Sequence, residues 1–272
     1  PADFTQKKAD RSYFEIASSH IPATIEKILD AAIRNGIPAR DIQVLAPMYR
    51  GTAGIDAINQ LMQELLNPLQ KGQFSFEASQ FHYRTGDKVI HLVNDAEVNV
   101  FNGDLGYITD LIPGKYTESK QDEIVIDFDG NEISYPRNEW YKIRLAYAMS
   151  IHKSQGSEFP VVILPITSAS KRMLERNLIY TAITRAKSKL ILLGELQAFD
   201  YAIKHIGTAR KTYLIERFSD LTESSEEANK PILEPTDQTD SQQSYILTEE
   251  NWTSIPAMIG ISQDDLQEFF GK

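Results

Sequence analysis

Hydrophobic residues in the first part of the chain recur at two spacings, and these spacings predict alternating helices and strands. Apolar residues repeat at helical spacing in residues 20–35 and 54–66, as expected of helices that bury one face. The first of these segments ends at Asn35-Gly36, a common helix-ending pair. Short apolar runs at 12–17 and 41–47 indicate strands. This alternation predicts an α/β fold in which helices cover both faces of a parallel sheet.

The pattern changes between residues 81 and 143, where short strands and tight turns replace the helices. Asn102-Gly103 and Asp129-Gly130 are hairpin signals, because both central residues of a type I′ turn need positive φ. The predicted strands of this segment are 87–93, 123–128 and 132–135. The segment therefore predicts a small all-β barrel of SH3-like size, inserted into the α/β domain.

The α/β pattern returns after the barrel and is followed by a polar tail. The predicted strands are 144–149, 161–165 and 189–194. The predicted helices are 171–187, 197–205 and 209–218. Residues 219–245 are rich in polar residues and proline, so we expect them to be disordered. Apolar residues return at 255–261 and 266–270, where local docking or disorder is the commoner outcome and a partner site the alternative.

Composition narrows the class of protein. The 272 residues, 42% of them hydrophobic, suit one or two globular domains. No apolar run approaches the length of a membrane span and Cys is absent, so we expect a cytoplasmic protein without disulfides or thiolate metal sites. The five His residues show no ligand spacing, and we expect no structural metal.

The net charge of −10 would argue against nucleic acid if it were evenly spread. Residues 219–272 contain 12 acidic and 2 basic residues, so residues 1–218 contain 26 of each. A neutral body can still present a local basic groove. Nucleic-acid binding is therefore not excluded.

A loop that cradles the phosphates of a nucleotide is missing from the sequence. None of the fourteen glycines lies in a G-x-x-x-x-G-K-[ST] run, whose backbone N–H groups and Lys hold phosphate and whose hydroxyl holds Mg²⁺. One interpretation is a protein that never used ATP. The other, which the blocks described next favour, is the C-terminal part of a longer protein whose nucleotide-binding half precedes Pro1.

Two sequence blocks carry the most specific chemistry. Residues 148–159 read AMSIHKSQGSEF and are followed by an apolar strand, and residues 177–187 read NLIYTAITRAK. In this order and at this spacing, the pair resembles motifs V and VI of superfamily 1 DNA helicases. The resemblance implies an ATP-driven motor on nucleic acid.

Arg185 is the first catalytic candidate. In motors of this type, ATP lies between two RecA-like lobes, and a guanidinium from the second lobe stabilises charge on the γ-phosphate. Arginine suits this role because it stays charged and donates as a planar fork. Without the surrounding block, a basic residue near a helix C-terminus would be explained by the helix dipole alone.

The first block supplies further candidates. Gly156 permits a tight turn after a short helix, and the resemblance places Glu158 near the ribose of the nucleotide. Residues that resemble DNA contacts of the family, or relays to the nucleotide, are Ser150, His152, Lys153 and Ser154, together with Thr181 of the second block. Such contacts to phosphate give affinity without sequence preference. The alternative for each is a helix cap or a solvated side chain.

Residues 41–51 resemble motif IV. A strand that runs out into Tyr49-Arg50 places both side chains at the carboxyl edge of a parallel sheet, where α/β proteins bind ligands. Arg50 is a candidate for a second γ-phosphate contact, and Tyr49 for packing on the base. Many strand ends carry Arg without such a role.

The barrel offers aromatic and polar candidates. We expect most of its aromatic residues to fill the small core and a minority to stack on single-stranded bases; they are Phe81, Tyr83, Phe101, Tyr107, Phe128, Tyr135 and Trp140. Asn102 and Arg84 are candidates for contact with the DNA backbone. Residues 127–131 faintly resemble a Ca²⁺ loop, but the glycine is misplaced and a hairpin turn is the better interpretation.

Taken together, residues 12–218 resemble the C-terminal motor lobe of a RecD-like superfamily 1 helicase, a family that includes the alpha subunit of exodeoxyribonuclease V. The stretches at 86–89, 100–106 and 152–159 are specific to that branch. The resemblance implies a discontinuous RecA-like lobe 2A and an SH3-like insertion 2B. We expect lobe 2A at 1–80 and 144–218, the insertion at 81–143 and an acidic tail at 219–272.

The family implies ATP and Mg²⁺ as cofactors, held mainly by an N-terminal lobe outside this sequence, and 5′-to-3′ movement on single-stranded DNA. It implies as partners that N-terminal lobe and repair or recombination proteins. We expect the chain alone to be inactive. The competing interpretation is a non-enzymatic module that binds nucleic acid or protein without nucleotide, while a nuclease lacks a supporting cluster of carboxylates with a Lys.

Overall fold

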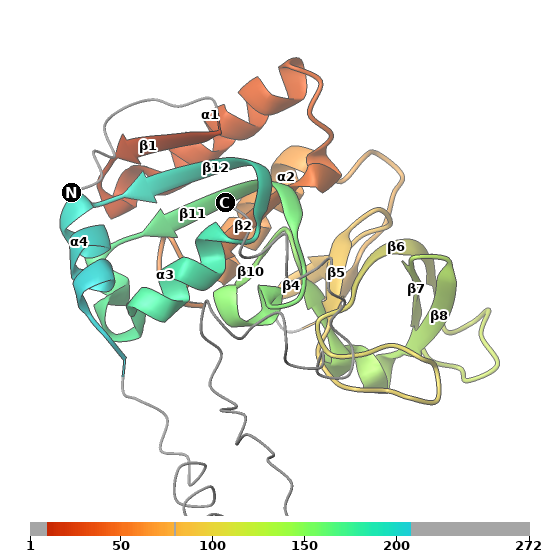
Figure 1. Ribbon diagram of the computed structural model, residues 1–272. Coiled ribbons are helices and arrows are strands. Elements are labelled where there is room, and N and C mark those ends of the chain that lie inside the picture. The colour runs from red at the N-terminus through yellow and green to blue at the C-terminus, as the bar shows by residue number, and fades with distance from the viewer. Residues whose placement is uncertain (1–9, 79, 208–272) are drawn as a thin grey trace, which may run out of the picture. The chain divides into compact units, whose positions relative to one another are not determined.

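The structure is a computed structural model that describes residues 10–78 and 80–207 (Figure 1). Its largest element is a five-stranded parallel sheet in the order β1-β12-β11-β2-β10. The strands are β1 (Arg11–Glu15), β2 (Ile42–Ala46), β10 (Ala148–Ser150), β11 (Phe159–Ile166) and β12 (Ala186–Gly194). The predicted parallel sheet is confirmed.

Helices cover both faces of this sheet, as predicted (Figure 1). They are α1 (Ile21–Arg34), α2 (Ile55–Leu66), α3 (Arg176–Ile183) and α4 (Leu196–Lys204). Neighbouring residues of a strand point to opposite faces, so Val44 of β2 packs with α1 and α2, whereas Leu45 packs with α3 and α4. The central strand β11 is therefore apolar throughout, and β2 is apolar except for buried Gln43.

A second, antiparallel sheet has the order β8-β7-β6-β5-β9, consistent with the predicted SH3-like insert. Its strands are β5 (Lys88–His91), β6 (Leu105–Ile112), β7 (Glu123–Phe128), β8 (Asn131–Pro136) and β9 (Ile143–Leu145), and a separate hairpin consists of β3 (Phe76–Ala78) and β4 (Phe81–Tyr83). Five of the seven expected aromatic residues are buried: Phe81, Tyr83, Phe128, Tyr135 and Trp140. Phe101 and Tyr107 are exposed.

Of the two predicted hairpin turns, one is confirmed. Asp129 and Gly130 join β7 to β8 with φ of 53° and 90°, as a type I′ turn requires. The hairpin at Asn102-Gly103 is wrong, because β5 and β6 are joined by a long loop in which Asp95 pairs with Val100. Asn102-Gly103 forms instead a single turn that leads into β6.

The predicted strand at 144–149 is two strands that belong to different sheets. Leu145 of β9 pairs with Val89 of β5, whereas Ala148 of β10 pairs with Val44 of β2. Only Ala146 and Tyr147 lie between the two strands. An apolar run cannot reveal this change of partner, because both strands are buried.

The predicted helix at 171–187 is also wrong. A 3₁₀ helix (Ser168–Met173) and α3 are separated by extended residues, and this break buries Leu174 completely. The chain leaves α3 before Ala186, which pairs with Phe159 at the start of β12. The predictions for 209–218, 219–245 and 255–270 lie outside the described residues.

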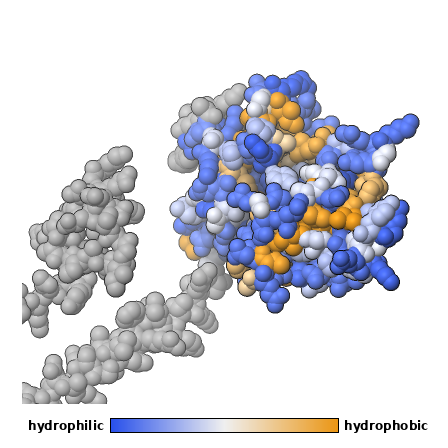
Figure 2. Space-filling model, turned by 90° about the vertical axis from the view of Figure 1, so that its right-hand side faces the viewer, coloured by the Kyte–Doolittle hydropathy of each residue, from blue (hydrophilic) through white to orange (hydrophobic). Residues whose placement is uncertain are grey.

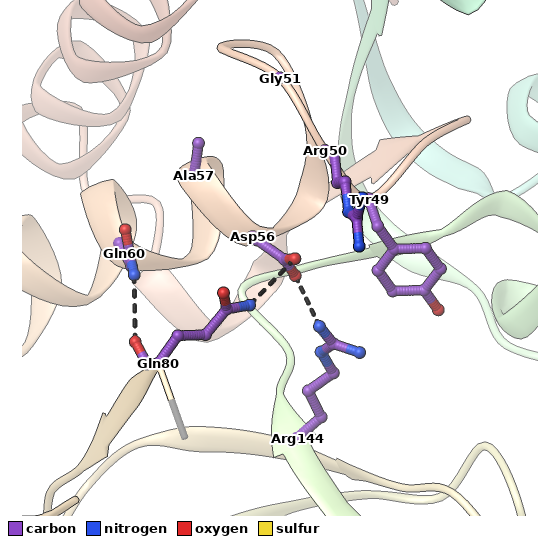
Figure 3. A pocket seen from close by; sticks show the side chains of 8 residues that line it. All are labelled: Tyr49, Arg50, Gly51, Asp56, Ala57, Gln60, Gln80 and Arg144. Carbon is purple, nitrogen blue, oxygen red and sulfur yellow. Dashed lines mark hydrogen bonds and ion pairs between the residues drawn. The ribbon is translucent and has the colours of Figure 1, made fainter. Parts of the chain in front are cut away.

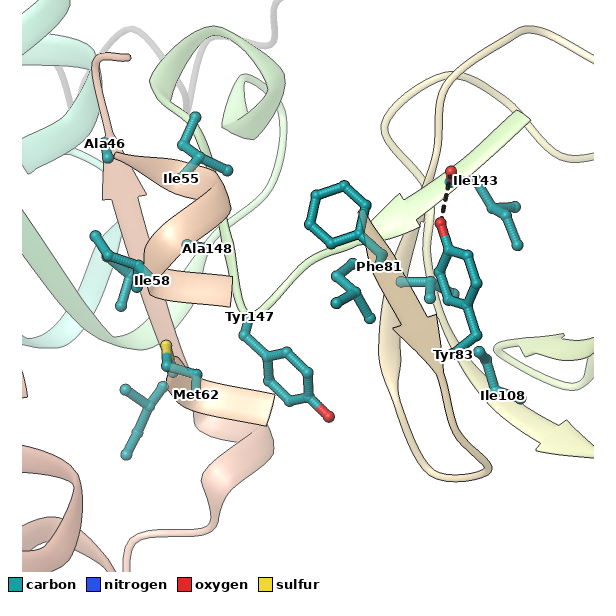
Figure 4. Packing of buried hydrophobic residues seen from close by; sticks show 14 of the residues in the cluster. Ala46, Ile55, Ile58, Met62, Phe81, Tyr83, Ile108, Ile143, Tyr147 and Ala148 are labelled. Atoms are coloured by element: carbon teal, nitrogen blue, oxygen red, sulfur yellow. Dashed lines mark hydrogen bonds between the residues drawn. The ribbon is translucent and has the colours of Figure 1, made fainter. Parts of the chain in front are cut away.

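A continuous hydrophobic cluster connects α1 and α2 with the antiparallel sheet. Figure 4 shows Tyr147 between side chains of α2, such as Met62, and those of the β3–β4 hairpin, such as Tyr83. The Tyr147 hydroxyl donates to Asp87 Oδ1 at 3.0 Å. Tyr147 therefore ties α2, the two-residue link and the start of β5 together.

Asp87 is fully buried and accepts four hydrogen bonds. Besides Tyr147, its donors are the side chains of Gln63 and Asn67 and the backbone N–H of Arg84. Burial raises the pKa of this carboxyl above its ordinary value, and the hydrogen bonds oppose that rise. The donors explain how a carboxylate is tolerated in this core.

A second polar group in the same region is Lys88. Its Nζ donates to Gln43 Oε1 at 2.9 Å and to the carbonyl of Arg40 at 3.3 Å. The Gln43 amide in turn donates to the carbonyls of Ala146 and Tyr147 at 3.1 and 3.0 Å. Burial lowers the pKa of Lys88 to about 8.

The surface of the described residues is mixed in character. Figure 2 shows a face on which hydrophilic residues dominate and hydrophobic residues form an interrupted band. Among the residues that the structure describes, no helix combines the length and apolar character needed to cross a membrane.

Candidate nucleotide and nucleic-acid interface

The block at 148–159 begins on β10 and turns sharply at the carboxyl end of that strand. A 3₁₀ helix, η4 (Ile151–Ser154), follows directly, and Ser150 Oγ accepts the backbone N–H of Lys153 at 3.4 Å. Gly156 then has a φ of 90°, which glycine adopts without strain. The predicted tight turn after a short helix is present, and Ser150 serves as its cap.

Lys153 and Asn102 lie in contact although 51 positions separate them. Lys153 Nζ donates to Asn102 Oδ1 at 2.8 Å, so η4 meets the loop that precedes β6. His152 is exposed beside them. Three of the residues predicted to contact DNA are thus brought together, and their contact with DNA stays a prediction.

Two other residues that were predicted to contact DNA have side chains that lie within the fold. Ser154 has no exposed surface, and its hydroxyl donates to the carbonyl of Ile151 at 2.7 Å. Arg84 is 6% exposed and is bound by Glu64 and by the carbonyl of Asn67. Both side chains have their bonding partners inside the fold, and their contact with DNA stays a prediction.

Arg185 lies in the turn between α3 and β12, and it holds the two sequence blocks together. Its Nη1 donates to the carbonyl of Ser157 at 3.0 Å, and its Nε to the carbonyl of Thr181 at 3.3 Å. Its own carbonyl accepts the N–H of Phe159 at 2.8 Å. The side chain is half-buried, and among the described residues no carboxylate pairs with it.

The remaining candidates of the two blocks lie close by in sequence and have modest contacts. Glu158 is exposed and pairs with Lys187 at 3.4 Å between Oε2 and Nζ. The Thr181 hydroxyl donates to the carbonyl of Asn177 at 2.9 Å. Contact of Glu158 with a nucleotide, or of Thr181 with DNA, stays a prediction.

Tyr49 and Arg50 line a pocket of about 540 Å³ between the loop after β2, α2 and the second sheet (Figure 3). The Arg50 guanidinium is exposed and forms no hydrogen bond or ion pair with another described residue. The polar residues of the pocket that the sequence did not indicate are Asp56, Gln60, Gln80 and Arg144. They come from separate segments, and no local pattern indicates that they meet.

Arg144 lines this pocket and contacts Asp56, Tyr49 and Phe81. It pairs with Asp56 at 2.8 Å, and Gln80 donates to the other oxygen of the same carboxylate at 3.1 Å (Figure 3). The Arg144 guanidinium also lies 4.9 Å from the ring of Tyr49 and 5.2 Å from that of Phe81. These cation–π contacts hold the motif IV tyrosine against the second sheet.

The structure does not bring the two candidate catalytic arginines into contact. Arg50 follows the carboxyl end of β2, whereas Arg185 precedes the amino end of β12. No hydrogen bond of the described residues joins them. In the same part of the chain, no group of three or more His, Asp or Glu residues is placed to hold a metal ion.

Comparison with known families matches both parts of this architecture. Residues 145–193, which include the link, η4 and α3, match the UvrD-like helicase C-terminal domain. Residues 58–128 match the SH3 domain of the ATP-dependent RecD-like DNA helicases.

Curated relatives agree with these matches. The chain is 35% identical to the ATP-dependent RecD2 DNA helicase of Deinococcus radiodurans over 176 residues, which cover 65% of this chain and 23% of that protein. It is 30% identical to the RecBCD enzyme subunit RecD of Mycolicibacterium smegmatis over 152 residues, 56% of this chain and 25% of that protein. The chain thus spans about a quarter of the length of these two relatives.

The parallel lobe and its inserted sheet, with the two matched blocks, define the C-terminal region of a superfamily 1 helicase. The SH3 match and the relatives place it more narrowly, and the chain is the C-terminal region of a RecD-like helicase. The resemblance inferred from the sequence is confirmed.

Among solved structures, the chain is similar to a Bacteroides Pif1 helicase in complex with ADP-AlF3 and single-stranded DNA. The identity is 19%, the TM-score is 0.41, and the match covers 77% of this chain and 56% of that one. A similarity of this degree supports no statement about individual residues.

Proposed function

We propose that the chain forms the second motor lobe of an ATP-dependent DNA helicase that moves 5′ to 3′ on single-stranded DNA. The observation that carries the proposal is the state of Arg185: a half-buried guanidinium without a carboxylate partner among the described residues. Such a charge is costly to bury unless an anion completes its environment. The γ-phosphate of ATP held by a neighbouring lobe is an anion of the right kind.

The internal contacts of Arg185 suit an arginine that must be held ready. Bonds to Ser157 and Thr181 use part of its donor set and fix the plane of the guanidinium. A guanidinium has five N–H donors, so others remain for a phosphate oxygen. Preorganisation of this kind lowers the reorganisation required when charge develops in the transition state.

Arg50 and Tyr49 extend the proposal to the motif IV pocket. The Arg50 guanidinium fits a second phosphate contact because it is exposed and unpaired in the described structure. The Tyr49 ring, backed by Arg144, offers a face for a base. ATP would supply the phosphoryl group and the free energy of hydrolysis, while its phosphate loop and Mg²⁺ belong to the proposed N-terminal lobe.

On the nucleic-acid side, Lys153 and Asn102 supply a phosphate contact and a polar neighbour at the carboxyl end of β10. Ser150 shapes the turn that presents them. Closure of the two lobes would shift η4 along the strand, and opening after hydrolysis would reset it. Repair or recombination proteins are the partners that the family suggests.

The test is ATP hydrolysis, stimulated by single-stranded DNA, in the longer protein that we propose contains this chain. Arg185→Ala should lower kcat by about 10³-fold or more, the effect of losing an arginine finger. Arg185→Lys keeps the charge but loses the fork, and should remain strongly impaired. Lys187→Ala is the matched control, because Lys187 is exposed and pairs only with Glu158 in the described structure.

The 272-residue chain alone should show no ATP turnover. If Arg185→Ala in the longer protein folds normally and retains wild-type turnover, the motor proposal is wrong. Single-strand binding that is unaffected by nucleotide in that longer protein would instead support the non-enzymatic binding module.

A further inference from the structure

Hydrogen bonds fix the backbone of the turn at residues 101–104, which contacts Lys153. The backbone N–H of Phe101 donates to the Asp104 carboxylate at 2.7 Å, and that of Asn102 donates to Asn94 Oδ1 at 2.9 Å. The N–H of Asp104 closes the turn on the carbonyl of Phe101 at 3.1 Å. Gly103 has a φ of 110°, a conformation open to glycine. The side chain of Phe101 is therefore presented from a fixed backbone.

Phe101 is 46% exposed, whereas five other aromatic residues of the insert are buried. Exposing half of a large apolar ring forgoes hydrophobic stabilisation. A ring kept exposed by a well-bonded turn is available to an external ligand. A π-face suits a nucleic-acid base, because every base can stack on it.

The neighbourhood of the ring supplies the charge that a nucleic acid needs. Asn102 accepts a hydrogen bond from Lys153, and a Cβ placed on Gly103 would lie 3.8 Å from the carbonyl oxygen of Lys153. The turn thus packs directly on η4. An aromatic ring and an ammonium group are held together by consecutive residues of one turn.

Two of the three acidic residues of the same loop are already engaged, and the third, Glu97, is exposed. Asp104 accepts the N–H of Phe101, and Asp95 pairs with Lys142 at 3.0 Å between Oδ2 and Nζ. The Lys153 ammonium, by contrast, is bound only by the neutral amide of Asn102 among the described residues. A phosphate can therefore replace a weak, uncharged partner of Lys153 without breaking an ion pair.

We propose that Phe101 is a stacking platform for a base of single-stranded DNA, and that Lys153 binds a phosphate next to that base. This inference rests on the proposed function and adds a sequence-independent contact from the inserted sheet. It divides the binding free energy into an apolar part at Phe101, insensitive to salt, and an ionic part at Lys153, sensitive to salt.

The experiment measures binding of a fluorescein-labelled oligothymidylate to the 272-residue chain by anisotropy over a range of salt concentrations. Phe101→Ala should weaken binding about 5- to 100-fold, the effect expected from loss of one stacked base, with an unchanged salt dependence. Lys153→Ala should reduce the slope of log K against log salt by about 0.7. Phe101→Trp should preserve binding.

Tyr141→Ala is the matched control, since Tyr141 is an aromatic residue of the insert that is 68% exposed outside this turn. It should bind like wild type. A 5-iodouridine oligonucleotide should also crosslink to Phe101 on irradiation, as located by peptide fragmentation.

Wild-type chain that does not bind the oligonucleotide at low salt would count against the proposed function itself. Binding by wild type that Phe101→Ala leaves unchanged would overturn only the stacking role. Equal weakening of binding by Phe101→Ala and Tyr141→Ala would also overturn the stacking role. So would a Phe101→Ala variant that binds DNA normally but associates poorly with a protein partner.

Discussion

Replacing Lys88 with Met should stabilise the protein at neutral pH and destabilise it at alkaline pH. Lys88 is 5% exposed, and its ammonium group is held by Gln43 Oε1 and the carbonyl of Arg40. No carboxylate pairs directly with it among the described residues. Removal of the ammonium therefore relieves a buried charge and leaves the Gln43 oxygen without its donor.

The magnitude follows from the pKa. Burial lowers the pKa of Lys88 from 10.5 to about 8, which corresponds to a penalty of about 3 kcal/mol for the charged form in the folded state. An unpaired buried acceptor costs about 2 kcal/mol. At pH 7, Lys88→Met should therefore increase the free energy of unfolding by about 1 kcal/mol.

The sign changes as the pH rises. Between pH 8 and 10.5 the folded wild type has lost the Lys88 proton while the unfolded chain retains it, so the stability of the wild type increases with pH. Near pH 10, most of the charge penalty is gone in the wild type, whereas the variant still lacks the hydrogen bond. Lys88→Met should then be about 1 kcal/mol less stable than wild type.

The assay is urea unfolding followed by circular dichroism at pH 7, 8, 9 and 10. Burial raises the pKa of Tyr83 and of Tyr135 to about 12, but these groups are present in both proteins and their effect cancels in the difference. Lys27→Met removes a charge from the exposed surface of α1 and should show no such change of sign. A difference between Lys88→Met and wild type that stays constant with pH would refute the reasoning.

Two further substitutions test the junction and the parallel sheet. Tyr147→Phe removes the hydroxyl that donates to buried Asp87 and should lower the free energy of unfolding by about 2 kcal/mol in urea at pH 7; unchanged stability would show that the bond contributes nothing. Gly194→Ala should lower it by about 3 kcal/mol or more, because φ is 124° and the added Cβ would overlap the carbonyl oxygen of Ile166. Gly130→Ala, at φ 90° in open space, should cost only about 1 kcal/mol, and equal melting temperatures for the two glycine variants would contradict this account.

Much of the fold could be predicted because its signals are local. The amphipathic spacing of 20–35 and 54–66 corresponds to α1 and α2, and Asp129-Gly130 forms the turn that its positive φ values require. The blocks at 148–159 and 177–187 identified the family because their residue order is specific. These features depend on neighbours in sequence.

The features that the sequence did not predict depend instead on contacts between residues far apart in the chain. The split of 144–149 depends on which distant strand each half pairs with, and the helix predicted at 171–187 breaks to bury Leu174. Ser154 and Arg84 have residue types suited to DNA, but their partners lie inside the fold. The motif IV pocket was missed for the same reason, since Arg144 reaches Asp56 across 88 positions.

The short link at Ala146 and Tyr147 has a mechanical consequence. The Gln43 amide binds both carbonyls of the link, and the N–H of Ala146 donates to the carbonyl of Lys88. Any displacement of β10 would therefore be transmitted directly to β9, because the two-residue link is short and held by hydrogen bonds. The antiparallel sheet would then move as a lever arm attached at β9. A small displacement of β10 would become a larger displacement at the end of that sheet farthest from the link.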